Sequence, residues 1–127
     1  MMTYAIKDHV WTMPDGTQYS GHAGHGYGLN NPDAIQEVGV GPLPPGLYNL
    51  GPWQDGSLYG PSWARLGPLI SRLYPDAGNE MYGRNDFAIH GGNGSNPPTD
   101  SDGCVIMQHN DRQAVCDSGE PQVTVTL

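Results

Sequence analysis

The chain has 127 residues, the size of one domain, and a formal net charge of −8. Its 5 Lys and Arg against 13 Asp and Glu argue against binding to nucleic acid or to an anionic membrane surface, because both need clustered basic side chains. The 19 Gly and 12 Pro are accompanied by 3 Trp and 7 Tyr, which favours a folded, turn-rich, mostly β domain over a disordered chain.

The N-terminal residues show no targeting signal. Residues 1–10 include one Lys, one Asp and one His but no apolar core segment, so we expect no secretory signal peptide. No stretch approaches the roughly 20 apolar residues that a membrane helix needs. We therefore expect synthesis in the cytoplasm, and any destination outside it would be reached by a route that leaves no such signal.

The first third of the chain predicts a hairpin followed by a loop. Residues 3–13 alternate loosely and are expected to form a strand or a strand pair. The turn residues of 14–17 then open a hairpin. Residues 18–31 are rich in Gly, His and Asn and show neither helical nor strand period, so we expect a long loop there.

Prolines dominate the next segment. Those in 41–52 forbid a helix and predict extended chain and turns, with a short strand over 47–50. Residues 63–66 are expected to form another short strand. Residues 69–74 fit a strand or a single helical turn equally well.

The second half of the chain carries two strands around a long polar loop. Residues 85–90 predict a strand that ends on a histidine, and 103–107 predict a buried strand that begins with Gly-Cys. Between them, residues 91–102 contain no apolar side chain. Loops of this length without secondary structure are uncommon in compact domains and are often functional.

The C-terminal residues predict a helix and a last strand. Residues 110–116 fit a short helix with Asn110 as a possible N-cap, and 123–127 fit a β-branched strand. No internal repeat or linker interrupts the chain, so we expect one domain over 1–127.

The histidine and the cysteine that border the polar loop are candidate catalytic residues. If the two strands are adjacent, His90 and Cys104 lie at the same end of a sheet. A free thiol has a pKa of roughly 8.5, so an imidazole is needed to produce the nucleophilic thiolate. Gly103 would let a substrate carbonyl approach closely, and the N–H groups of Gly103 and Cys104 would form an oxyanion hole.

Spacing alone leaves other interpretations open. Cys104 would also fit a small buried apolar residue, with His90 as a hydrogen-bonding strand end. A disulfide between Cys104 and Cys116 would close a short loop. His22 and His25 have the spacing of a metal-binding pair that His90 and Cys104 would complete. The alternatives for this glycine-rich stretch are a loop near the substrate cleft, in which His22 would be a substrate contact, and a plain solvated loop.

The segment around these residues resembles the active-site signature of YkuD-type L,D-transpeptidases, a His, a loop, then Ser/Thr-His-Gly-Cys. It is more similar to the Tlde1 (DUF2778) branch, whose pattern is His-Gly-x-Asn followed by Ser-x-Gly-Cys. Further segments resemble this branch in family order over nearly the whole chain: 19–21, 28–32, 41–48 and 82–84.

The resemblance implies a mainly β, small L,D-transpeptidase-like sandwich or barrel with one or two short helices. It implies that Cys104 attacks the carbonyl of the third residue of a peptidoglycan stem peptide, forms a thioester and expels D-alanine. His90 would act as base and then as acid, and Ser101 would support the loop or the thiolate. Water as acceptor gives L,D-carboxypeptidase activity, a free D-amino acid gives exchange, and another stem gives a crosslink.

The resemblance also implies contacts to the substrate. Gly91 and Asn93 of the His-Gly-x-Asn segment are expected to line the substrate site. Asp102 stands where broader L,D-transpeptidases carry a histidine, so the base has to be His90, and Asp102 is expected to be a loop residue or a substrate contact. Arg84 is the best candidate for binding a substrate carboxylate, with a surface salt bridge as the alternative.

The resemblance further implies an antibacterial effector of a type VI secretion system. Such a protein would act on stem peptides in the periplasm of the target cell, and the producer would carry a cognate immunity protein. A phage or housekeeping wall enzyme and a non-catalytic wall-binding module remain alternatives. We expect no metal and no other cofactor, and we expect a backbone carbonyl to orient the His90 ring.

Overall fold

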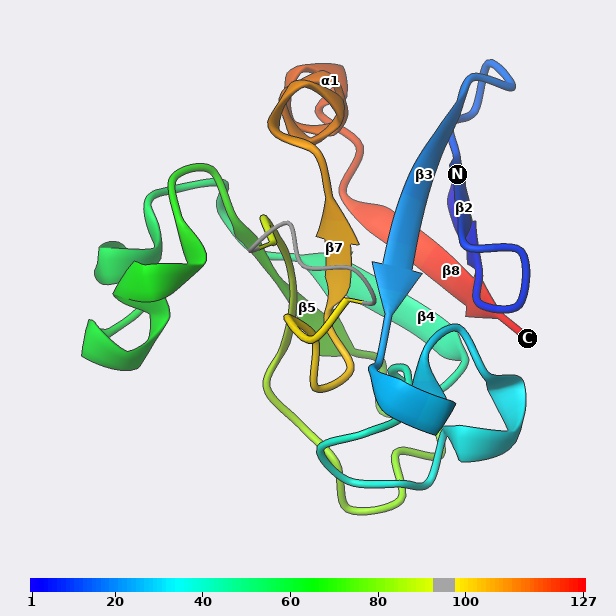
Figure 1. Ribbon diagram of the computed structural model, residues 1–127. Coiled ribbons are helices and arrows are strands. Elements are labelled where there is room, and N and C mark those ends of the chain that lie inside the picture. The colour runs from blue at the N-terminus through cyan, green and yellow to red at the C-terminus, as the bar shows by residue number, and fades with distance from the viewer. Residues whose placement is uncertain (93–97) are drawn as a thin grey trace.

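Eight short strands close into a barrel in the computed structural model of the chain (Figure 1). The structure describes residues 1–92 and 98–127, except for the side chains of Ser62 and Arg65. Around the barrel the strands follow the order β1-β2-β3-β7-β6-β5-β4-β8. Their bounds are Met2–Ala5 (β1), Val10–Thr12 (β2), Gln18–Ala23 (β3), Gly46–Leu50 (β4), Ser71–Pro75 (β5), Phe87–His90 (β6), Val105–Met107 (β7) and Gln122–Thr126 (β8).

One α-helix is present in the described part of the chain. Helix α1, His109–Ser118, follows β7 directly and lies at the end of the barrel where β7 ends (Figure 1). The expected N-cap at Asn110 is wrong, because the Gln108 carbonyl already accepts the Arg112 N–H and the helix starts earlier. The barrel and this helix confirm a mainly β fold with one or two short helices.

Alternate residues of the strands fill the barrel interior. On β6 and β7, Phe87, Ile89, Val105 and Met107 are buried in the main apolar core. Because successive side chains of a strand point to opposite faces, the residues between them face outward. The outward face of these two strands therefore remains available for a site.

Strand β3 overturns the expectation of a long loop over 18–31. It pairs with β2 on one side and with β7 on the other. Gly21 hides the strand period in the sequence, yet a Cβ atom at this position would lie 3.0 Å from Val105 Cγ1. The glycine therefore allows β3 and β7 to pack closely, and its carbonyl accepts a hydrogen bond of 2.7 Å from the Tyr4 hydroxyl.

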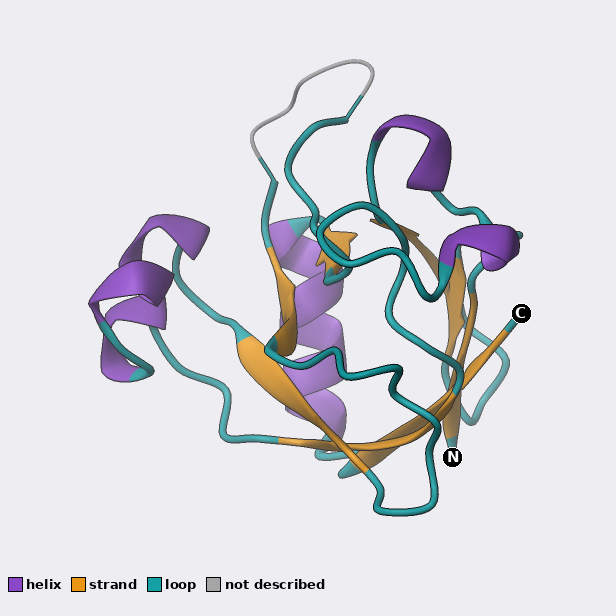
Figure 2. Ribbon diagram, turned by 90° about the horizontal axis from the view of Figure 1, so that it is seen from below, coloured by secondary structure: helices purple, strands orange, loops and turns teal. Residues whose placement is uncertain are grey.

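The expected strand over 63–66 is also wrong. This segment belongs to the 3-10 helix η4, Pro61–Leu66, which starts on a proline and ends before Gly67, a residue with a φ of +92°. With the 3-10 turn η3, Gly56–Leu58, it forms an arm that stands out from the barrel wall between β4 and β5 (Figures 1 and 2).

Two further 3-10 turns lie in the connection from β3 to β4. They are η1, Gly26–Gly28, and η2, Pro32–Ala34. The Asn31 side chain caps η2 by accepting the Asp33 N–H at 3.0 Å. Across the described residues, no helix combines the length and the apolar character needed to cross a membrane.

Candidate functional site

Strands β6 and β7 are parallel neighbours, and this pairing places the histidine and the cysteine on one face of the sheet. His90 is the last residue of β6 and lies opposite Ile106. Cys104 directly precedes β7, so the same register places it opposite Ala88. Residues two apart on a strand share a face, so His90 and Cys104 both face outward, and ordinary strand dimensions put their Cα atoms roughly 8 Å apart.

The thiol of Cys104 lies in an environment that keeps it protonated. Its Sγ is 3.8 Å from the backbone carbonyl oxygen of Asp86, just before β6. Burial raises the pKa of the thiol to about 11, and the nearby carboxylates of Asp102 and Asp86 act in the same direction. The backbone N–H of Ala88 opposes this shift. Cys104 would therefore need a base to become a thiolate at neutral pH.

The imidazole of His90 is held by the backbone of the next residue. The side chain is buried, with 3% of the residue exposed. Its Nδ1 lies 2.6 Å from the Gly91 carbonyl oxygen, so Nδ1–H donates to that oxygen. A backbone carbonyl therefore orients the His90 ring, as expected from the sequence. With the proton on Nδ1, Nε2 is the nitrogen that carries the lone pair.

Ser101 organises the loop in front of the cysteine. Its buried hydroxyl donates to the Cys104 carbonyl at 2.5 Å and accepts the N–H groups of Gly24 at 3.0 Å and of Gly103 at 3.1 Å. One donor and two acceptor positions are then in use. Of the two roles expected for Ser101, these bonds support the loop rather than the thiolate.

The expected oxyanion-hole donor at Gly103 is wrong. Its N–H is already bound to the Ser101 hydroxyl. The glycine is required for packing instead, because its φ is +140° and a Cβ atom would lie 2.6 Å from Phe87 Cε1 and 2.8 Å from Arg84 Nη2. The N–H of Cys104 itself remains next to the sulfur.

The expected carboxylate-binding role of Arg84 is also wrong. Arg84 is buried, and burial lowers the pKa of its guanidinium. The guanidinium donates to four backbone carbonyls. The acceptors are Ile35 at 2.7 Å, Pro42 at 2.7 Å, Gly41 at 2.8 Å and Asp102 at 3.1 Å. This arginine therefore fixes the chain on both sides of the cysteine loop and offers no free fork to a ligand.

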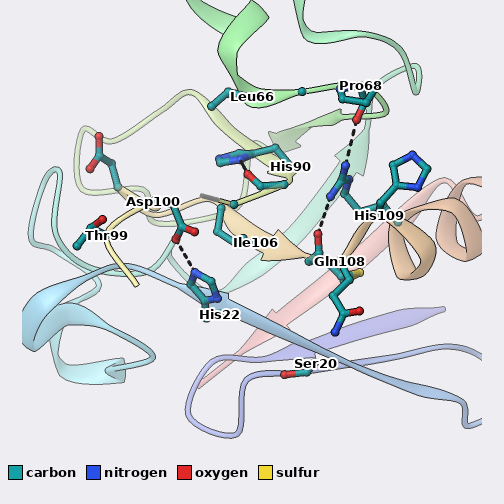
Figure 3. Close-up of a pocket in the computed structure, with 16 residues that line it drawn as sticks. Ser20, His22, Leu66, Pro68, His90, Thr99, Asp100, Ile106, Gln108 and His109 are labelled. Carbon is teal, nitrogen blue, oxygen red and sulfur yellow. Dashed lines mark hydrogen bonds and ion pairs between the residues drawn. The ribbon is translucent and has the colours of Figure 1, made fainter. Parts of the chain in front are cut away.

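A cleft of about 990 Å³ lies on the outward face of β3, β7 and β6 (Figure 3). Cys104 is not among its described lining residues, because the sulfur is directed toward the Asp86 carbonyl. Rotation about the Cα–Cβ bond is the movement that would turn the sulfur toward the cleft. The lining includes His22, His90, Gly91, Asp100, Asp102 and Arg112.

The other expected site residues fall into three groups. His22 belongs to strand β3 rather than to a loop, and it lines the cleft together with Gly91 and Asp102. Asn93 lies outside the described residues. His25 does not join His22, because its Nδ1 contacts the Ser101 carbonyl oxygen at 2.8 Å. Within residues 1–92 and 98–127 no group of three or more His, Cys, Asp or Glu could hold a metal ion.

Both cysteines of the chain are free thiols, so the structure does not contain the disulfide considered from the sequence. Cys116 lies on α1.

Two cleft residues gave no signal that singled them out. Asp100 is paired with His22 at 2.6 Å, a contact between residues 78 positions apart. Arg112 is buried on α1 and donates to the carbonyls of Met107 at 2.6 Å, Leu69 at 2.9 Å and Pro68 at 3.1 Å.

Comparison with family models identifies the chain. The model described as the Tlde1 domain matches residues 17–126, which span every strand from β3 to β8 and both His90 and Cys104. The chain belongs to the Tlde1 domain family. A comparison with curated protein sequences finds no match for this Tlde1 domain.

A solved structure shares the fold of this Tlde1 domain. Mycobacterium tuberculosis L,D-transpeptidase 1 is similar with a TM-score of 0.54 and 12% sequence identity, over 99% of this chain and 58% of that chain. The Tlde1 domain thus spans somewhat more than half the length of the transpeptidase. At this identity the likeness concerns the fold, and it confirms an L,D-transpeptidase-like barrel.

Proposed function

We propose that this Tlde1 domain is a cysteine enzyme that removes or exchanges the terminal D-alanine of peptidoglycan tetrapeptide stems. The observation that carries the proposal is the arrangement of His90. Its ring is fixed by the Gly91 carbonyl so that Nε2 is the basic nitrogen, and it shares the outward sheet face with Cys104. A peptidoglycan-related fold, given by the family and by the similar transpeptidase structure, supports the choice of substrate.

The first half-reaction follows from these positions. His90 Nε2 takes the proton of Cys104, and the thiolate attacks the carbonyl carbon of the third stem residue. The tetrahedral oxyanion lies next to the Cys104 N–H. When it collapses, His90 returns the proton to the amine of the leaving D-alanine, and a thioester to Cys104 remains.

The buried thiol explains why a base is needed. With a pKa of about 11, only about one thiol in 10⁴ is ionised at pH 7. In this proposal His90 removes the thiol proton once the sulfur has turned from the Asp86 carbonyl toward the cleft, so the resting protein keeps an unreactive cysteine.

Purified tetrapeptide muropeptides test the proposal. Wild-type protein should release D-alanine or exchange it for an added D-amino acid, and Cys104→Ala should do neither. Cys116→Ala is the matched control, because it removes the other thiol, on α1, and should retain activity. Stable binding of muropeptides without D-alanine release from wild type would favour a wall-binding module and contradict the proposal.

We further propose a role as an antibacterial type VI secretion effector that acts in the target-cell periplasm and is countered by a cognate immunity protein. The resemblance of this sequence to the Tlde1 family supports this role. Periplasmic expression should shorten or exchange stem peptides and slow growth, and co-expression of the neighbouring gene should restore growth. A neighbouring lysis cassette without a protective gene would favour the alternative of a phage or housekeeping wall enzyme.

A further inference from the structure

A second histidine lies on the other side of the nucleophile, on strand β3. His22 is opposite Ile106 in the β3–β7 pair, and Ile106 is opposite His90 in the β6–β7 pair. The three side chains therefore form one row across three neighbouring strands on the outward face. Cys104 precedes Ile106 by two residues, so the register places both histidines at the same offset from the cysteine.

His22 is paired with a carboxylate that is almost fully enclosed. Its Nε2 lies 2.6 Å from Asp100 Oδ1, and the side-chain exposure is 24% for His22 and 8% for Asp100. Figure 3 shows His22 joined to Asp100 in the cleft, with Ile106 between His22 and His90. A buried carboxylate that meets an imidazole in a cleft is an arrangement suited to proton transfer.

The pair leaves one ring nitrogen available. Asp100 engages Nε2, and within the described residues Nδ1 of His22 has no hydrogen-bond partner. A carboxylate on one ring nitrogen orients the other and stabilises the charge that forms when the ring takes a proton. His90 is buried, whereas the His22 side chain is 24% exposed, so His22 is the more accessible of the two histidines to water.

We propose that His22, oriented by Asp100, is the base of the second half-reaction, in which the acceptor attacks the thioester on Cys104. This assignment rests on the proposed function. His22 Nδ1 takes a proton from water while the water oxygen bonds to the thioester carbonyl carbon, and the C–S bond then breaks with the electron pair leaving on Sγ. His22 then gives the proton that it took from water to the sulfur, and the new carboxylic acid releases its own proton to the solvent.

The two histidines thereby serve opposite sides of the cysteine. His90 transfers the thiol proton to the leaving amine, and His22 takes a proton from the acceptor that enters from the β3 side. A free D-amino acid in place of water gives exchange through the same proton transfer, with the neutral amine as the attacking group. One sheet face therefore serves both halves of the reaction.

Pre-steady-state kinetics of His22→Gln test the assignment. The variant should release one equivalent of D-alanine per enzyme at close to the wild-type rate, and steady-state turnover should then fall about 10²-fold or more. Intact-protein mass spectrometry should show the accumulated thioester. Hydroxylamine, a nucleophile that attacks thioesters without help from a base, should restore turnover.

The matched control is His25→Gln, which removes the contact of another histidine to the same loop. It should slow both phases by a similar factor and accumulate no thioester. If circular dichroism shows that His22→Gln is unfolded, Asp100→Asn keeps the ring and should also accumulate the thioester.

Two outcomes overturn the inference. If wild type turns over but His22→Gln accumulates no thioester, or slows the burst as much as the steady state, the inference fails and the proposed function stands. If wild type itself neither releases D-alanine nor forms a thioester, both fail.

Discussion

The protonation state of Cys104 in the resting protein can be measured directly. In the Cys116→Ala background, Cys104 is the single thiol, and its alkylation by neutral iodoacetamide follows the thiolate fraction. A thiol with an ordinary pKa between roughly 8.5 and 9 is about 1–3% ionised at pH 7, whereas a pKa of about 11 lowers this to about 0.01%. We therefore expect alkylation at pH 7 to be about 100- to 300-fold slower than in the urea-unfolded protein, with an inflection near pH 11.

Asp102→Asn in the same background tests the electrostatic part of this argument. Its carboxylate raises the thiol pKa, but its side chain is 82% exposed and therefore strongly screened. We expect alkylation at pH 7 to become only a few times faster, because burial is the larger cause. An inflection below pH 7 in the parent protein would show a preformed thiolate–imidazolium pair and would refute the reasoning.

Three further changes test the packing around the nucleophile. Gly103→Ala, strained at φ +140° and in collision with Phe87, should lose about 2–5 kcal/mol in urea unfolding, clearly more than Gly16→Ala, whose φ is +91° in open space. Ser101→Ala removes three hydrogen bonds and should lose about 2–4 kcal/mol in the same assay. The raised pKa of Cys104 also makes the free energy of unfolding depend on pH. Between pH 9 and 11 the thiol ionises in the unfolded chain but not in the folded one, so the free energy of unfolding should fall by up to about 2–3 kcal/mol as pH rises through 11. Cys104→Ala should remove this contribution.

The two strands that carry His90 and Cys104 could be predicted because their signals are local, whereas the interpretation of the two residues as a catalytic pair came from the family resemblance. A histidine at the end of an apolar run and a Gly-Cys step at the start of the next are visible within 103–107 and 85–90. That the two strands are neighbours was a condition of the sequence argument, and the structure shows it. The direction of pairing, parallel rather than antiparallel, came from the structure.

The roles of the charged residues could not be predicted, because they depend on contacts between distant parts of the chain. Arg84 meets carbonyls 42 to 49 residues away, and nothing beside it in the sequence separates such an arginine from one that binds a carboxylate. The pairing of His22 with Asp100 spans 78 residues. Gly21 likewise made β3 look like a loop in the sequence. The reason for the glycine is the close packing against Val105, which lies far along the chain.

The parallel pairing of β6 and β7 explains why the cleft forms where it does. Antiparallel neighbours can be joined by a two-residue turn, but parallel neighbours need a long return connection. The return from His90 to Cys104 places Gly91, Asp100 and Asp102 in the cleft that opens over the outward sheet face. Ser101 then anchors the end of the return through the Gly24 N–H beside β3. The connection that the topology requires thus supplies the cleft wall, and the residues at its two ends supply the proposed base and nucleophile.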